Sequence, residues 1–452
     1  MNGRARHLWG RWVRMAAVTV AALATALTGL AGASPSPAPA PRFGAPVRVT
    51  PPLGYGYEPT VVIDRFGNIF GTAHKENWQL VVGPDVNSPL YTRSMSWAWV
   101  SVDDGQRWNN IPGLTPLSLE QREFGDEGDM AFDDADHLYF VDTNVADATI
   151  TRWTTKGRGL DNITLDFTRP LIPSVEPLDD RPWVTAHGNG SVFYMANQGL
   201  KQPGGGRFTM YHSSDGGMTF DLGQKLEDSG WCRLAASHVR RSPYVYVSCT
   251  NFGLDQLTGT PGLLYTYVSA DDGDTWIRYD MGTYNKDDLT QSYPSVVVAP
   301  NGVVYVLYVD GVDVDPDTGM PARNRLRLFT SLDDGVHWTE QDITPRKGRY
   351  EYAWLSVSPR DPRLLGMGVY YRRDNDSYWR VYGATWRAGQ IPTLVSLDQG
   401  HPVARPTEDD APGDYLGSTF DLHNHLSVVW TRRNQSIAGE ISFREIYFAR
   451  SL

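Results

Sequence analysis

An eight-residue pattern, Ser-x-Asp-x-Gly-x-x-(Trp/Phe), occurs four times in this chain, starting at Ser101, Ser213, Ser269 and Ser331. Each copy follows a strand-like run such as Leu263-Leu-Tyr-Thr-Tyr-Val268. The pattern predicts a tight turn between two strands, because Asp accepts backbone N–H bonds, Gly supplies a positive φ and the aromatic ring packs back on the strands. We therefore expect structural roles for its acids, which are Asp103, Asp215, Asp271 and Asp333.

A second repeat consists of two short strand-like runs joined by a turn. Its seven copies begin at Glu58, Asp129, Arg181, Arg233, Tyr293, Tyr352 and Tyr415. Their spacing of roughly 50 to 70 residues matches one four-stranded propeller blade. The sequence therefore predicts an all-β fold, a β-propeller of four-stranded antiparallel blades. We expect seven blades, with six as the alternative.

The last repeat ends with the chain, so its blade has only three strands of its own, the third at Ile446-Tyr-Phe-Ala449. A propeller without open edges needs a fourth strand there. The segment Ala45 to Thr50 lies at the other end of the chain and is the obvious supplier. We expect an N-terminal strand to close the ring.

The Asp-containing turn pattern resembles the Asp box, or BNR repeat, of the sialidase (neuraminidase)-like superfamily. The resemblance extends over nearly all of the propeller region as architecture. It implies a glycoside hydrolase that removes terminal sugars from extracellular glycans. Sialidase catalytic domains have six blades, so the seven repeats counted here depart from that family.

The N-terminus has the features of a secretory signal. Four arginines, at positions 4, 6, 11 and 14, precede an apolar run and the small-residue site Ala31-Gly-Ala33. We interpret residues 1–33 as a signal peptide, 34–46 as a Pro/Ala/Ser-rich tether and 47–452 as one propeller domain. The protein is then expected to be secreted and extracellular, without a membrane span after cleavage.

The net charge makes nucleic acid a poor partner. The whole chain carries −11, and loss of the four arginines in residues 1–33 makes the remainder −15. An acidic protein repels nucleic acid and anionic membranes. A glycan or polysaccharide is the expected ligand, and the protein is expected to be a monomer that requires no cofactor.

The two cysteines, Cys232 and Cys249, fall at opposite ends of a predicted hairpin whose turn lies near residues 240–243. They would then face each other across the strand pair. In an oxidising compartment this placement favours a disulfide, and two buried thiols are the alternative.

Blade topology places the loops before each innermost strand on the same face as the loops between the second and third strands. The Asp-containing turns lie on the opposite face. The first set of loops carries acids, arginines and aromatic residues, a mixture suited to a sugar because carboxylates exchange protons, Arg binds carboxylates and aromatic rings stack on pyranose faces. Ion pairs between neighbouring blades are the alternative explanation for the same residues.

The sialidase resemblance implies specific roles on that face. The family binds the substrate carboxylate with three arginines and uses a Tyr–Glu nucleophile pair with an Asp acid. The candidates for the catalytic roles here are Asp126, Asp180, Tyr293, Glu351 and Tyr415, and no family motif selects among them. The substrate-binding candidates are Glu58, Arg181, Trp231, Arg233 and Arg372. The family motif (Phe/Tyr)-Arg-Ile-Pro is absent, and Tyr57-Glu-Pro-Thr60 stands in its place.

Two other functions remain open at this stage. The same face could bind a glycan or a protein without catalysis. It could also belong to a polysaccharide lyase for uronate sugars, in which an arginine neutralises the carboxylate and a Tyr or His acts as base. Each reaction leaves a different product, a new reducing end for a hydrolase and an unsaturated sugar for a lyase.

An Asp-rich stretch, Asp310-Gly-Val-Asp-Val-Asp-Pro-Asp-Thr-Gly319, resembles the start of a calcium loop. Asp313, Asp315 and Asp317 alternate in the way that oxygen ligands do in such loops. The glycine comes one residue late and no glutamate follows in register. A structural calcium is one expectation, and a solvated loop is the other.

Overall fold

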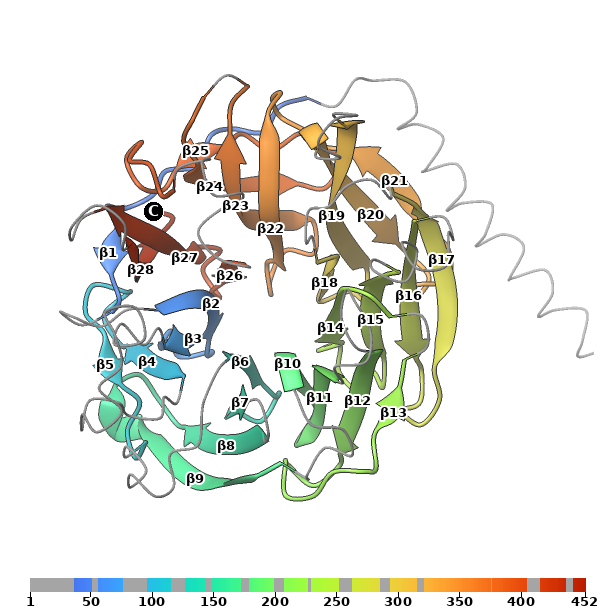
Figure 1. Ribbon diagram of the computed structural model, residues 1–452. Helices are drawn as coiled ribbons and strands as arrows, with labels where there is room; N and C mark the ends of the chain where they lie inside the picture. Colours follow the sequence, from blue (N-terminus) through green and yellow to red (C-terminus); the bar gives the residue numbers. More distant parts are fainter. Residues whose placement is uncertain are drawn as a thin grey trace, which may run out of the picture. The chain divides into compact units, whose positions relative to one another are not determined.

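The computed structural model describes residues 36–50, 56–75, 96–114, 127–143, 148–171, 179–198, 207–226, 229–251, 262–284, 293–314, 321–374, 376–404, 415–435 and 442–452. The described chain contains 28 strands and one short 3-10 helix, η1 (Leu160–Asn162). The strands form seven sheets of four, and Figure 1 shows these sheets arranged around a central axis.

Each sheet is a meander whose first strand lines the axis. Blade 1 contains β2 (Gly56–Ile63), β3 (Ile69–Lys75), β4 (Trp97–Ser101) and β5 (Asn109–Asn110). Blade 2 contains β6 (Glu127–Phe132), β7 (His137–Thr143), β8 (Ala148–Thr155) and β9 (Ile163–Pro170). Blade 3 contains β10 (Asp179–His187), β11 (Ser191–Gln198), β12 (Arg207–Ser213) and β13 (Gln224–Lys225).

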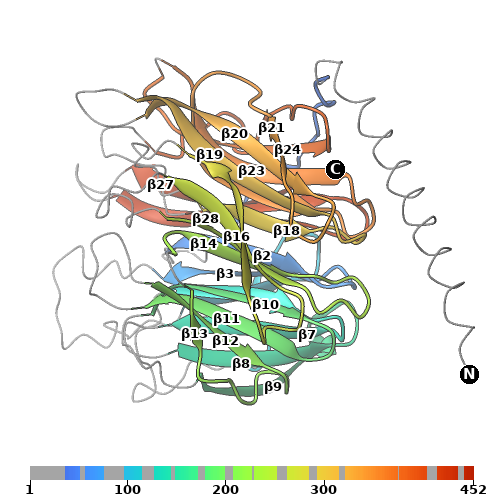
Figure 2. The same ribbon diagram turned by 90° about the vertical axis from the view of Figure 1, so that its right-hand side faces the viewer.

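The second half of the ring repeats this order. Blade 4 contains β14 (Cys232–Ala236), β15 (Val245–Thr250), β16 (Leu263–Ser269) and β17 (Ile277–Thr283). Blade 5 contains β18 (Ser295–Val298), β19 (Val304–Val314), β20 (Pro321–Ser331) and β21 (Thr339–Asp342). Blade 6 contains β22 (Arg349–Val357), β23 (Leu364–Arg372), β24 (Arg380–Arg387) and β25 (Val395–Ser396). Figure 2 shows these blades from the side.

Blade 7 combines both ends of the described chain. It contains β26 (Gly417–Phe420), β27 (Leu426–Gln435), β28 (Ser442–Arg450) and, at its outer edge, β1 (Val47–Arg48). Arg48 lies opposite Tyr447 and forms an ion pair of 2.7 Å with Glu445. The predictions of seven four-stranded blades and of closure by an N-terminal strand are confirmed.

The four Asp-containing turns have one hydrogen-bond pattern. In blade 1 the Asp103 carboxylate accepts the Arg107 N–H at 2.8 Å, and the Ser101 hydroxyl accepts the Gly105 N–H at 2.9 Å. The other three turns repeat both bonds within about 0.1 Å, at the carboxylates of Asp215, Asp271 and Asp333 and the hydroxyls of Ser213, Ser269 and Ser331. These acids hold the turn itself, as the pattern predicted.

Each of these turns also packs on the blade before it. A Cβ added to Gly105 would lie 2.0 Å from the Phe448 ring of blade 7, and one added to Gly273 would lie 2.6 Å from the Phe193 ring of blade 3. The second acid of the turn reaches the same neighbour, since Asp272 accepts a 2.8 Å bond from His187 and Asp104 pairs with Arg450. The turns therefore fasten consecutive blades together.

Hydroxyl groups join the innermost strands, which form no backbone ladder with one another. The Thr185 hydroxyl accepts the Ala236 N–H at 3.1 Å, and the Ser295 hydroxyl accepts the Leu355 N–H at 3.0 Å. Apolar cores fill the spaces between the sheets. None of the described helices could cross a membrane.

Candidate functional site

Three inner strands share a bulge near their first residues. The register of β2, β10 and β22 shifts at Tyr57/Thr60, Asp180/Trp183 and Glu351/Trp354 respectively. At each bulge a residue other than glycine has a left-handed backbone: Glu58 at φ 57°, Arg181 at φ 55° and Tyr352 at φ 50°. Such conformations cost about 1–3 kcal/mol each and gather at functional sites. The inner strands line a channel along the propeller axis. The bulges mark the end of this channel at which the inner strands begin.

A proline makes two of these conformations more demanding. Pro59 follows Glu58 and Pro182 follows Arg181, and a residue before proline prefers an extended backbone. The backbone N–H of Arg181 donates a 2.6 Å hydrogen bond to Glu127 of the preceding blade. A buried carboxylate therefore helps to hold the strained residue in place.

Three buried glutamates occupy this end of the channel. Glu58, Glu127 and Glu351 belong to blades 1, 2 and 6 and are at least 93% buried. Glu351 Oε1 accepts a 3.0 Å bond from Arg349. Glu58 Oε2 lies 3.9 Å from Nδ1 of His74, whose ring stacks on Tyr57 with 4.0 Å between centroids. The site thus supplies carboxylates from several sides, the groups that move protons in glycosidic bond cleavage.

Two arginines of blade 6 lie opposite each other and share a single carboxylate. Arg349 and Arg372 are cross-strand partners on β22 and β23, and both guanidiniums lie over the buried Trp379 ring, at 5.6 and 5.3 Å. Arg349 pairs with Glu351, whereas Arg372 has no ion pair in the described part of the chain. Burial lowers the pKa of Arg372, and the Arg349 charge lowers it further. Glu351 and Asp376 act in the opposite direction and raise the pKa of Arg372, although neither forms an ion pair with it in the described part of the chain.

An aromatic plug closes the centre of the channel. It consists of Trp183, Trp231, Tyr293, Trp354 and Tyr415, whose ring centroids are 5.0 to 6.2 Å apart. Arg233 lies inside the plug, with its guanidinium 3.9 Å from the Trp183 ring and 4.1 Å from the Trp354 ring. Asp129 Oδ2 is 3.4 Å from the same guanidinium. Burial lowers the pKa of Arg233 and raises that of Asp129.

The plug contains several of the predicted site residues. Tyr415 has no exposed surface and Tyr293 is 4% exposed, and both rings pack against the other members of the plug. Burial, followed by the nearby Glu127 and Glu58, raises the pKa of Tyr415, which opposes the phenolate that a nucleophile would need. Arg233 packs on two rings of the plug and pairs with Asp129, and the substrate-binding role predicted for it stays a prediction.

Other predicted residues have mixed outcomes. Trp231 is buried beneath the Arg181 guanidinium, 4.4 Å from its ring, so Arg181 covers the surface expected to stack on sugar. Glu58, Glu351, Arg181 and Arg372 lie at the end of the channel where they were expected. Asp126 lies outside the described residues, and Asp180 is described only as a backbone position on β10. The roles predicted for these two acids stay predictions.

The calcium hypothesis falls largely outside the described chain. Asp313 is part of β19, in register with Arg323 of β20, whereas Asp315 and Asp317 are not described. Within the described ranges no three acidic, His or Cys side chains come together as metal ligands. Structural calcium stays a prediction.

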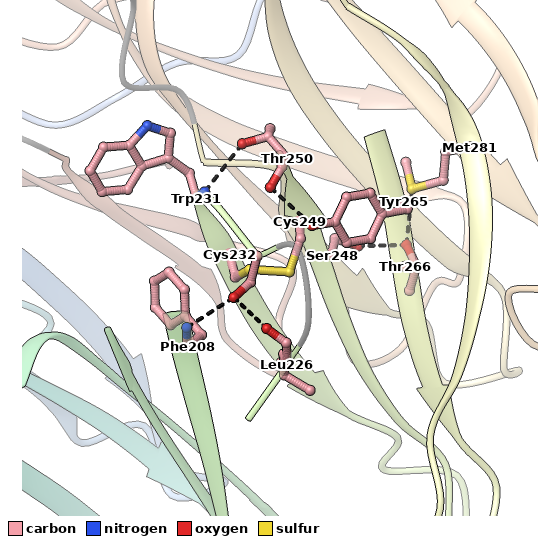
Figure 3. The surroundings of a disulfide bond; sticks show 11 residues. Phe208, Leu226, Trp231, Cys232, Ser248, Cys249, Thr250, Tyr265, Thr266 and Met281 are labelled. Atoms are coloured by element: carbon pink, nitrogen blue, oxygen red, sulfur yellow. Dashed lines mark hydrogen bonds between the residues drawn. A yellow bond between two sulfur atoms is a disulfide. The ribbon is translucent and has the colours of Figure 1, made fainter. Parts of the chain in front are cut away.

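A disulfide anchors the strand below Trp231. Cys232 and Cys249 face each other on β14 and β15 and are joined, as Figure 3 shows. The Trp231 N–H donates to the Thr250 hydroxyl at 3.2 Å, and the Tyr265 hydroxyl donates to the Thr250 carbonyl at 3.2 Å. The disulfide and these bonds hold Trp231 in its place within the plug.

Sequence reasoning missed part of the site. Glu127 and Arg349 are the first residues of the inner strands β6 and β22. The sequence could therefore place them at this end of the channel, but it could not predict their contacts. Trp379 and His74 had no sequence signal, because neither begins an inner strand: His74 lies on β3, and Trp379 directly precedes β24.

Comparisons with known proteins assign no family. No family model and no curated sequence matches the chain. Among solved structures, an ulvan lyase of polysaccharide lyase family PL25 is 10% identical, with a TM-score of 0.49, covering 90% of this chain and 93% of its own. An α-L-arabinofuranosidase from Fusarium graminearum is 12% identical, with a TM-score of 0.43, covering 90% and 98%.

The NanB sialidase from Streptococcus pneumoniae is 11% identical, with a TM-score of 0.43, covering 88% of this chain and 68% of its own. These identities and TM-scores are too low to assign an activity to this chain.

Proposed function

We propose that this protein is a secreted carbohydrate-active enzyme that binds an acidic sugar residue and cleaves its glycosidic bond. The observation that carries the proposal is the pair Arg349 and Arg372, two arginines on facing strands of which only Arg349 forms an ion pair, with Glu351, in the described part of the chain. Glu351 and Asp376 act on Arg372 from a longer range. A buried charge without a partner is unfavourable, and a carboxylate or sulfate on the ligand would remove that cost. Arginine forks bind such groups in bidentate fashion.

The neighbouring acids supply the chemistry. Glu58 and Glu127 come from adjacent blades, and the charges of both raise the pKa of the buried Tyr415. We assign them as the pair that exchanges protons with the glycosidic oxygen and the attacking water. The backbone strain at Glu58 and Arg181 fixes the positions of these groups before the ligand arrives. The signal-like residues 1–33 support an extracellular setting.

The test compares three variants of the purified protein on a panel of sialosides, uronate-containing polysaccharides and neutral glycosides. Glu127→Gln keeps an acceptor for the Arg181 N–H but cannot exchange protons. We expect it to lower kcat/KM by about 10²–10⁴-fold. Arg372→Gln should raise KM for acidic substrates with a smaller effect on kcat. Glu340→Gln, on the outer strand β21, is the control and should retain activity.

Both product types are measured, reducing ends for hydrolysis and ultraviolet absorbance for elimination. Turnover of neutral glycosides alone, or full activity in Arg372→Gln, would contradict the acidic-sugar assignment. Absence of turnover across the whole panel would reject the enzymatic function and leave a non-catalytic glycan-binding propeller.

A further inference from the structure

A cavity of about 480 Å³ occupies the channel on the other side of the aromatic plug. Its walls come from the inner strands of all seven blades and from the turns that follow these strands. Strand residues such as Val297 and Ala235 form its sides, and Arg233, Asp129 and Trp354 form its inner end. Ligand pockets commonly measure about 300–1,000 Å³, so this cavity has the size of a small-molecule site.

The inner end combines hydrogen-bonding groups with aromatic rings. Trp183 and Trp354 both pack on the Arg233 guanidinium, whose central carbon lies 3.9 and 4.1 Å from their ring centroids, and the N–H groups of this guanidinium are hydrogen-bond donors. Asp129 approaches one edge at 3.4 Å and also accepts the Val184 N–H at 3.1 Å. Donors and acceptors therefore stand side by side, with aromatic rings next to them.

The charged side chains that line the cavity favour a neutral ligand over an ionic one. Arg233 and Asp129 neutralise each other at the inner end. At the other end, beside the turns that follow the inner strands, three buried aspartates line the cavity, and they would repel an anion. They are Asp64, Asp133 and Asp421.

The same aspartates leave little for a cation, because each already accepts a backbone N–H of its own turn at 2.8 to 2.9 Å. The basic groups there are also paired, Arg65 with Asp136 and His238 with Asp134.

Hydroxyl groups complete a lining that suits a neutral polyhydroxylated molecule. Thr185, Ser295, Ser356 and Ser418 line the cavity from four blades. Ser356 and Ser418 bond to each other at 2.7 Å across the gap between blades 6 and 7. Hydroxyl groups act as donor and acceptor at once, as the hydroxyls of a sugar do.

We propose that this cavity is a second binding site, specific for a neutral sugar ring that enters from the side of the Asp-containing turns. Its ring hydroxyls would accept from the edge of Arg233 and donate to Asp129, with Trp354 beside them. The site is independent of the acidic-sugar site, because the plug separates the two ends of the channel.

The test is calorimetric titration of the full chain with glucose, galactose, mannose and arabinose, and with glucuronate as the charged probe. Ala235→Phe fills the cavity from β14, where residue 235 lies on the same face of the strand as Arg233. Val357→Phe fills it from β22. Ala270→Phe is the matched control, since Ala270 is exposed in blade 4. Thermal unfolding shows that each variant is folded.

We expect at least one neutral sugar to bind the native chain and Ala270→Phe equally, with at least a tenfold loss of affinity in whichever cavity-filling variant is folded. The proposal is overturned if no neutral sugar binds, if binding survives both cavity-filling variants, or if only glucuronate binds. Activity on acidic sugars is measured separately, so its absence would reject the proposed function and leave this site standing.

Discussion

At the scale of single residues, two turn glycines of blade 1 have different structural roles. Gly67 and Gly105 have nearly the same backbone, at φ 86° and 84°. A Cβ on Gly67 would meet nothing within 4 Å, whereas one on Gly105 would overlap the Phe448 ring. The first glycine satisfies only its own turn, and the second also makes room for the neighbouring blade.

This pair separates backbone strain from packing. Gly67→Ala should lower the free energy of unfolding by about 1 kcal/mol through strain alone. Gly105→Ala should lose about 1–3 kcal/mol more, because the added methyl overpacks the contact with Phe448. Denaturant unfolding of both variants measures the difference. Equal losses would show that the turn of blade 1 does not depend on its contact with blade 7.

The acids of the Asp-containing turns link stability to pH. Hydrogen bonds from the Thr275 side chain and N–H lower the pKa of Asp271. The pKa of Asp215 is also lowered, since bonds from Thr219 and others in its turn outweigh the effect of burial. A carboxyl whose folded pKa is depressed stabilises the fold above its unfolded pKa of about 3.9, and this contribution is lost as the pH falls through the folded value.

Asp271→Asn should therefore lower the Tm at pH 6, where the native carboxylate is charged. The gap between native and variant should narrow progressively below about pH 4, as the native acid becomes protonated. Thermal scans across that range measure it. A gap that stays constant down to the lowest pH would mean that the charge of this acid does not support the turn.

At the scale of elements, the blades were predictable because their signals are local. Turn acids and glycines recur at fixed offsets from strand-like runs, so one stretch of chain specifies its own hairpin. The bulges of β2, β10 and β22 were not predictable, since the left-handed backbone at Glu58 depends on neighbouring blades. The Glu127–Arg181 bond joins residues 54 apart, and only the assembled ring brings them together.

The same reasoning explains why the burial of Tyr293, Tyr415 and Arg233 could not be predicted. Their sequence positions correctly placed them near the channel end. Whether an aromatic side chain faces solvent or packs on four others is decided by side chains from five blades. Burial in the plug is therefore a property of the whole ring.

At the scale of the whole molecule, stability depends on joining the two ends of the chain. The Val49 N–H donates a 2.8 Å bond to the Ile446 carbonyl, and Val49 is buried against blade 7. Val49→Pro removes that donor and should cost about 3 kcal/mol or more. The exposed Ala45→Pro is the control. Unfolding midpoints of both variants measure the effect, and an unchanged midpoint in Val49→Pro would show that the ring does not need this closure.

The most direct test of the proposed function is a crystal structure of the inactive Glu127→Gln variant with a uronate-containing oligosaccharide. We predict that the sugar carboxylate lies between the Arg349 and Arg372 guanidiniums, within hydrogen-bond distance of both, with the glycosidic oxygen next to residues 58 and 127. A ligand bound elsewhere, or one whose carboxylate faces away from both arginines, would contradict the account.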